Sequence, residues 1–316
     1  MHGTDFAAYL LAKEGVDSAT LFQVTTATQE FCTSEPFEIA ANQPMETVNR
    51  IQTQKATESR MSKKRVDNRM QLGYGSAWHM LRCLGFQREL FSQIVADAVG
   101  GTEVEWLDFT RYQGSKTYPK DHPILDDEWK RVNFLSKAHP MREKFDEFWP
   151  HGSDQNWDAV GWAKIGGQRE LLIVEAKGHI GEIKKRKKEP KRGGRKIAEA
   201  FQETREKLEC QADPMNWLKG YYQHANRLAT LYFLNCYDPE NAIPARLLFI
   251  YFCGDTYKGK KCPKNPAGWN GVLADVRTEL GLGGESELER RVHDVFLPVN
   301  LPEFTSETYK RWKGSE

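Results

Sequence analysis

The feature that most constrains the fold is a nearly continuous apolar run, ARLLFIYFC, at residues 245–253. Strand side chains alternate between two faces, so such a run predicts a strand that is buried on both sides. Helical patterns precede it at about 196–210 and 214–236, and a helix near 269–280 and a strand near 292–299 follow it. A strand that is buried on both faces and is preceded and followed by helices indicates an α/β domain around one sheet.

Further strands and helices are predicted upstream of this run. The periodicity of apolar residues predicts a helix at 76–99 with a break near Gly85, a strand at 103–109, a helix at 126–149, and strands at 157–163 and 170–177. The last two strands flank Gly166-Gly167, a pair that suits a tight hairpin turn. The order of elements predicts a central mixed sheet flanked by helices.

Composition limits the class of protein. The 316 residues are 39% hydrophobic and 28% charged, which is typical of a packed core, and the net charge is only +1. We expect an N-terminal appendage and linker at residues 1–70 and one folded domain at 71–316. None of the six cysteines forms a C-x-x-C pair, so reduced thiols are favoured. Neither a signal peptide nor a spanning segment is evident, which favours the cytoplasm and no membrane partner.

The strand at 170–177 (ELLIVEAK) ends in a pair of charged residues. Glu175 and Lys177 are two apart, so they point to one face, and Leu172, Val174 and Ala176 point to the other. A hairpin through Gly166-Gly167 would bring Asp158 alongside them. Two carboxylates can hold Mg²⁺, which polarises a phosphate and lowers the pKa of a bound water, and a lysine can orient or deprotonate that water.

The pattern of Asp158, sixteen intervening residues and then Glu175-Ala176-Lys177 resembles the PD-(D/E)XK nuclease superfamily, which has the restriction-endonuclease-like fold. The resemblance covers roughly residues 76–255 and includes the order of elements. It implies that Asp158, Glu175 and the backbone carbonyl of Ala176 bind Mg²⁺, with Mn²⁺ as a substitute. It also implies that Lys177 assists the nucleophilic water in hydrolysis of a phosphodiester bond.

Two further positions of the superfamily have candidates here. Gln223, in the helical pattern after the Glu-x-Lys strand, matches a catalytic glutamine that many members carry. Glu89 is the only acidic residue well inside the first helix, and it matches that position poorly. The residue before Asp158 is Trp157 rather than proline, and the insert between the first two strands is long. The number of metal ions, one or two, stays open.

Two other interpretations of the same residues remain. Glu175 and Lys177 could form a structural ion pair in an unrelated α/β protein. Alternatively, the chain could be a nucleic-acid-binding or scaffold module that keeps the nuclease fold but has lost efficient cleavage, since no good first-helix acid is present. Metal binding separates the first of these from a nuclease, and turnover separates the second.

A basic segment, KKRKKEPKRGGRK at residues 184–196, follows the proposed site. Such a block does not pack, and we expect it to contact phosphates without reading sequence. The partner is expected to be nucleic acid, DNA rather than RNA, and whether the chain forms a homodimer stays open. The residues expected to bind nucleic acid are Lys184, Lys185, Arg186, Lys187 and Lys188.

Several other side chains have both a functional and a structural interpretation. His179 lies two residues after Lys177 and could touch substrate, although a histidine without a role is favoured. Trp217, Tyr221 and Tyr222 could stack on bases, although core packing is the more frequent role of such residues.

Overall fold

The structure is a computed structural model that describes residues 74–107, 129–151, 155–183, 193–256, 259–299 and 305–314. The chain divides into two units, Met1–Arg69 and Met70–Glu316, and every described residue belongs to the second. The appendage and linker expected at residues 1–70 therefore lie outside the described residues. No helix in the described segments combines the length and apolar character that crossing a bilayer requires.

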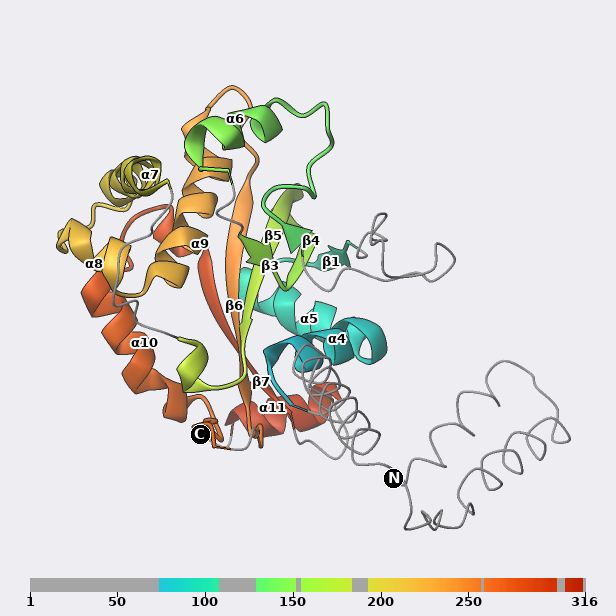
Figure 1. Cartoon of the computed structure of the whole chain (residues 1–316). Helices are drawn as coiled ribbons and strands as arrows, with labels where there is room; N and C mark the ends of the chain where they lie inside the picture. The colour runs from blue at the N-terminus through green and yellow to red at the C-terminus, as the bar shows by residue number, and fades with distance from the viewer. Residues whose placement is uncertain are drawn as a thin grey trace, which may run out of the picture. The chain divides into compact units, whose positions relative to one another are not determined.

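A five-stranded mixed sheet forms the centre of the second unit (Figure 1). Its strand order is β1-β4-β5-β6-β7; the pairs β1–β4 and β4–β5 are antiparallel, and β5–β6 and β6–β7 are parallel. The α/β fold with a central mixed sheet is thus confirmed. The strands are β1 (Glu103–Trp106), β4 (Ala159–Ile165), β5 (Gln168–Lys177), β6 (Ala245–Cys253) and β7 (Val292–Pro298), and a separate ribbon pairs β2 (Trp129–Lys130) with β3 (Asn156–Trp157).

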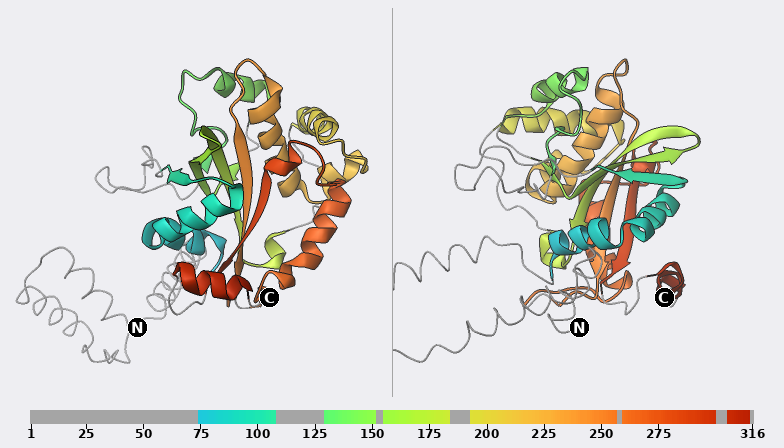
Figure 2. Two further views of the ribbon diagram at one scale, coloured as in Figure 1. Left: turned by 180° about the vertical axis from the view of Figure 1, so that it is seen from behind. Right: turned by 90° about the vertical axis from the view of Figure 1, so that its right-hand side faces the viewer.

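Helices cover both faces of this sheet (Figures 1 and 2). On one face, α4 and α5 pack over a core that includes Leu172, Val174 and Ala176 of β5. On the other face, a larger core that includes Leu171 and Ile173 lies beneath α7 to α10. The helices are α4 (Ser76–Phe86), α5 (Arg88–Val99), α6 (Pro140–Phe148), α7 (Gly194–Lys207), α8 (Pro214–Lys219), α9 (Tyr222–Tyr232), α10 (Ala267–Leu280) and α11 (Ser306–Gly314).

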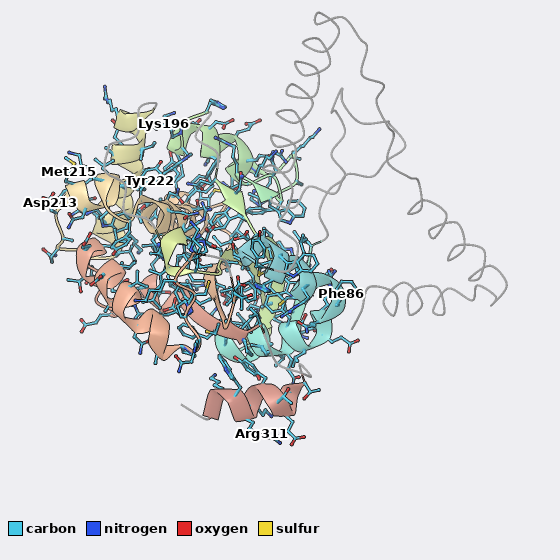
Figure 3. The ribbon with its side chains drawn as sticks, turned by 60° about the horizontal axis from the view of Figure 1, so that its bottom comes forward. Phe86, Lys196, Asp213, Met215, Tyr222 and Arg311 are labelled. Carbon is cyan, nitrogen blue, oxygen red and sulfur yellow. The ribbon has the colours of Figure 1, made fainter. Side chains whose placement is uncertain are left out.

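Two predicted helices differ from those observed. The pattern at 76–99 forms two helices that meet at Gln87, rather than breaking at Gly85, and Phe86 before the break is 71% exposed (Figure 3). The helix predicted for 126–149 is wrong at residues 129–139, and residues 126–128 lie outside the described residues. It begins only at Pro140, because His139 caps it by accepting a hydrogen bond from the Met141 N–H, and a proline fits the first helical position.

One further predicted helix is also divided. The pattern at 214–236 forms α8 and α9, which are separated at Gly220, and then a π-helical turn at Phe233–Tyr237. Short 3₁₀ helices at Ile180–Glu182 and Glu289–Arg291 were not predicted. The periodicity of apolar residues predicts which face of a helix is buried, but it does not predict where a capping residue or a glycine ends the helix.

The hairpin between β4 and β5 is the predicted one. Gly166 and Gly167 both have positive φ, 56° and 82°, and they join Ile165 to Gln168 in a two-residue turn. Such turns require two left-handed residues, which glycine adopts without a steric penalty. The register that follows pairs Ala159 with Val174. Asp158 therefore lies just before β4, beside the end of β5 that carries Glu175.

Candidate active site

The end of β5 places two buried charged side chains on one face of the sheet. Glu175 and Lys177 are each 3% exposed, and they point to the face that α9 covers. The Lys177 ammonium donates a hydrogen bond to Oε1 of Glu175. Burying a charge is costly unless it is paired, so Glu175 and Lys177 require further partners from the helices that cover this face.

Asp158 is fixed to β5 by its backbone and by its side chain. Its N–H donates to the Val174 carbonyl at 3.0 Å, and its Oδ2 accepts from the Ala176 N–H at 2.7 Å. The chain before it, Trp157, pairs with Trp129 in the separate ribbon rather than with β5. Asp158 therefore lies between β3 of the separate ribbon and β4 of the main sheet, and its carboxylate contacts β5.

Helix α9 supplies the partners of Glu175. Gln223 and Arg227 are four residues apart, so they project from the same side of the helix. Gln223 Nε2 donates to Glu175 Oε1 at 2.7 Å, and Lys177 donates to Gln223 Oε1 at 3.2 Å. Arg227 Nε donates to the other oxygen of Glu175, Oε2, at 2.7 Å. Both oxygens of the carboxylate are thus hydrogen-bonded to cations or to an amide.

This network determines the protonation state of Glu175. Burial by itself raises the pKa of the carboxyl group, but Arg227 and then Lys177 outweigh burial and lower the pKa to about 2. The group is therefore an anion at neutral pH. A carboxylate that stays ionised in a buried site is able to serve as a ligand for a cation or as a fixed negative charge.

Arg227 is a residue of the candidate site that the sequence analysis missed. Its guanidinium lies 4.7 Å from the centre of the Trp157 ring, and it donates to the Asn156 carbonyl at 2.6 Å and to Asn226 Oδ1 at 2.9 Å. An arginine so fully engaged is held in one orientation. The available signal was its position four residues after Gln223, which places both side chains on one helix face.

The predicted residues meet in one cavity of about 450 Å³. Asp158, Glu175, Lys177 and Gln223 line it, as does Ala176. The remaining lining residues are Ser76, Asn156, Glu182, Asn226 and Arg227.

Glu182 is a third carboxylate in this cavity that the sequence analysis did not single out. Its Oε2 accepts a hydrogen bond from the Gly178 N–H at 3.1 Å. Its Oε1 lies 3.2 Å from Nε2 of His179, which is 7% exposed. His179 therefore contacts an acid at the margin of the cavity, and it is not among the residues that line it.

Other candidates lie elsewhere. Glu89, which matches the first-helix acid poorly by sequence, is an exposed residue in the first turn of α5 and does not line the cavity. Trp217 is fully buried and donates to the Leu280 carbonyl at 2.9 Å; Tyr221 and Tyr222 are 3% and 9% exposed, so all three belong to the core. The basic residues Lys184, Lys185, Arg186, Lys187 and Lys188 lie outside the described residues.

The donor set of the cavity fits Mg²⁺. This ion binds one or two protein carboxylates and completes its shell with water and substrate phosphate. Asp158 and Glu175 provide two carboxylates, and Ala176 lines the same cavity. Within the described residues, no three Asp, Glu, His or Cys side chains are grouped closely enough to hold a metal by themselves. Carboxylates and the backbone of Ala176 are therefore the oxygen ligands that this cavity could offer to a cation.

The comparisons with known proteins add no candidate function. No family model, curated protein or solved structure matches this chain. Functional conclusions therefore depend on the chemistry of the cavity itself.

Proposed function

We propose that this chain is a Mg²⁺-dependent nuclease with a restriction-endonuclease-like core, acting on DNA rather than RNA. The observation that carries the proposal is that Asp158, Glu175 and Lys177 line one cavity with Gln223. The mixed sheet supports it. Asp158 and Glu175 lie at adjoining positions of the antiparallel β4–β5 hairpin, and β5 pairs with β6 in parallel.

Each side chain has a distinct role in this proposal. Asp158, Glu175 and the Ala176 carbonyl would hold Mg²⁺, and Mn²⁺ would substitute for it. The bound ion supplies polarisation of the scissile phosphate and a lowered pKa of a coordinated water. Lys177 would orient the attacking water or neutralise developing charge. Gln223 keeps the lysine in place, since it accepts from the ammonium and donates to Glu175.

Arg227 adds a constraint on metal binding. The structure pairs Glu175 with Arg227 and Lys177, so a cation that binds Glu175 must share or replace one of these contacts. A released arginine or lysine would then be free to bind a phosphate, for which both side chains are suited. Metal and nucleic acid should consequently bind more tightly together than separately.

A second candidate function is favoured by the same contacts. If Arg227 and Lys177 retain Glu175 when nucleic acid is present, the chain would bind nucleic acid without efficient cleavage. The absence of a first-helix acid among the residues that line the cavity points the same way. Turnover in the presence of metal distinguishes the two functions.

The decisive experiment uses Asp158→Asn. The amide keeps an oxygen that can accept from the Ala176 N–H and loses the charge that a cation requires. Asp158→Ala is less clean, since it also leaves the Ala176 N–H without its partner, which costs about 1 kcal/mol. Cleavage of single-stranded and duplex DNA is measured with Mg²⁺, Mn²⁺ or EDTA, and Mn²⁺ binding is measured by calorimetry.

We expect Asp158→Asn to lose metal binding and cleavage together. The matched control is Asp275→Asn on the exposed side of α10, which should keep both. Cleavage that resists EDTA, or full activity in Asp158→Asn, would contradict the proposal. Metal binding by the unmodified chain without cleavage of any DNA or RNA would favour the binding module.

A further inference from the structure

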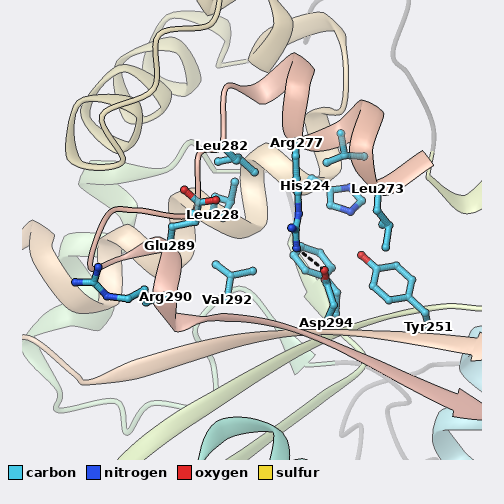
Figure 4. A pocket seen from close by; sticks show the side chains of 13 residues that line it. His224, Leu228, Tyr251, Leu273, Arg277, Leu282, Glu289, Arg290, Val292 and Asp294 are labelled. Atoms are coloured by element: carbon cyan, nitrogen blue, oxygen red, sulfur yellow. Dashed lines mark hydrogen bonds and ion pairs between the residues drawn. The ribbon is translucent and has the colours of Figure 1, made fainter. Parts of the chain in front are cut away.

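A second cavity, of about 260 Å³, lies over strands β6 and β7 (Figure 4). It is formed by α9, α10, the 3₁₀ turn at Glu289–Arg291 and strands β6 and β7. Phe249 and Tyr251 in its floor are the register partners of Glu175 and Lys177. The two cavities have no lining residue in common, so this is a separate site.

Aliphatic side chains form part of the walls, and the floor carries a carboxylate. Leu228, Leu273 and Val276 supply aliphatic surface from the two helices. Asp294 on β7 accepts a hydrogen bond from Arg277 Nη2 at 2.9 Å and another from the Tyr251 hydroxyl. Apolar walls with a few oriented polar groups are the usual features of a small-molecule pocket.

His224 is the second polar group of this cavity, and its ring has an unsatisfied atom. The side chain is buried, with 4% exposure, and it stacks on Phe249 with ring centres 4.6 Å apart. Its Nε2 makes no hydrogen bond within the described residues. Burial, then the positive charge of Lys177, lowers the pKa of His224 to about 3, so the ring is neutral at pH 7. A ligand or an ordered water in the cavity would supply the partner that this buried nitrogen lacks.

We propose that this cavity binds a nucleobase that carries an exocyclic amino group. A flat ring fits the volume, since a cavity of about 150 Å³ holds benzene. The aromatic side chains of Phe249 and Tyr251 are part of the lining that the ring would contact. A carboxylate such as Asp294 accepts from an amino group, as acidic side chains do from cytosine, and neutral imidazole pairs with a ring nitrogen.

The mouth of the cavity suits a nucleotide. Arg290 lines the cavity and is exposed, and Arg277 beside it is exposed although it donates to Asp294, so a phosphate attached to the base would meet cationic groups there. The base could belong to a free nucleotide or to an unpaired position in a nucleic-acid strand. The proposal does not depend on cleavage at Glu175.

Binding of CMP and UMP to the full chain tests the proposal, because these two nucleotides differ in whether C4 carries an amino group or an oxygen. Calorimetry is performed in EDTA, which removes metal-dependent binding at the other cavity. We expect CMP to bind about 5- to 150-fold more tightly than UMP, the range for one well-formed base contact. In a second arm, a DNA duplex with one bulged cytosine is compared with the fully paired duplex.

Two variants test whether the nucleotide binds in this cavity. Asp294→Asn replaces an acceptor with a group that can also donate, so it should abolish the preference for CMP over UMP. Val276→Phe fills the cavity and should abolish binding while the thermal midpoint is retained. The matched control, Asp275→Asn on α10, does not line the cavity and should bind as the unmodified chain does.

Each arm identifies one source of the base. Binding of CMP that Val276→Phe abolishes, with a preference over UMP that Asp294→Asn abolishes, indicates a free nucleotide. A preference for the bulged duplex that either variant abolishes, without binding of CMP, indicates a base within a strand. Equal binding of CMP and UMP together with equal binding of both duplexes, or binding that survives Val276→Phe, overturns the proposal.

Discussion

Glu175→Gln is expected to destabilise the fold, because it leaves two buried cations without their anion. Glu175 is 3% exposed, and Lys177 and Arg227 beside it are 3% and 4% exposed. Removing one partner of a buried ion pair costs about 3–5 kcal/mol. The lowering of the Glu175 pKa from 4.5 to about 2 corresponds to roughly 3 kcal/mol at about 1.4 kcal/mol per unit. Both arguments give a loss of about 3 kcal/mol.

Urea unfolding at pH 7, followed by circular dichroism and tryptophan fluorescence, measures this loss. In a thermal scan it should appear as a decrease of about 6–12 °C in the midpoint. The control is Glu105→Gln, which removes a pair with Arg169 in which the Glu105 side chain is 70% exposed. An exposed pair contributes less than about 1 kcal/mol. A loss in Glu175→Gln no larger than that of this control would refute the reasoning.

The dependence of this effect on pH has a defined sign. The pKa of Glu175 is lower in the folded chain than in the unfolded chain, so its stabilisation is complete above about pH 4.5 and disappears as pH falls through about 2. The difference in free energy of unfolding between the unmodified chain and Glu175→Gln should therefore be constant from pH 7 to 5. It should decrease to about half by pH 3. A difference that increases on acidification would contradict the assignment of charges.

The remaining predictions concern catalysis, the basic segment and a buried histidine. Lys177→Met should keep Mn²⁺ binding but slow single-turnover cleavage by about 10²–10⁴-fold, and an unchanged rate would remove the lysine from the mechanism. Changing the five basic residues at 184–188 to serine should weaken binding of all nucleic acids alike and reduce the slope of log affinity against log salt by up to about 0.9 per lost duplex contact. His224 has a pKa lowered to about 3 by burial and Lys177, so the unfolded chain takes up its proton first and stability should fall from pH 6.5 downwards. His224→Phe, which keeps the stacking on Phe249, should make urea unfolding less dependent on pH between 7 and 5, and an equally steep dependence would show that His224 is not responsible.

The hairpin and its charged residues were predictable because the rules that place them are local. Alternation along β5 puts Glu175 and Lys177 on one face, and the Gly166-Gly167 turn fixes which residue of β4 comes alongside. These rules need only the chain between Asp158 and Lys177. The prediction of the sheet succeeded for the same reason, since β6 is apolar enough to be identified as a central strand by itself.

The charge balance of the site was not predictable, because it depends on a helix far along the sequence. Two carboxylates considered alone should repel, and removing either should then relieve the repulsion. Arg227 reverses this expectation for Glu175, since a cation on each side makes the carboxylate stabilising. Asp158 likewise has a structural role, the hydrogen bond from the Ala176 N–H, that spacing does not reveal.

The connectivity of the candidate site also has a consequence for the order in which it is assembled during folding. Asp158 and Ala176 are separated by 18 residues, whereas Arg227 and Glu175 are separated by 52. Contacts between residues close in sequence close smaller loops and form earlier than distant ones. The β4–β5 hairpin, with Asp158 and Glu175, should therefore form before α9 docks. In that intermediate, Glu175 has Lys177 but not Arg227 as a cationic partner. Acid or a divalent cation that is present during refolding would change the rate at which α9 docks, and therefore the rate at which the native state forms.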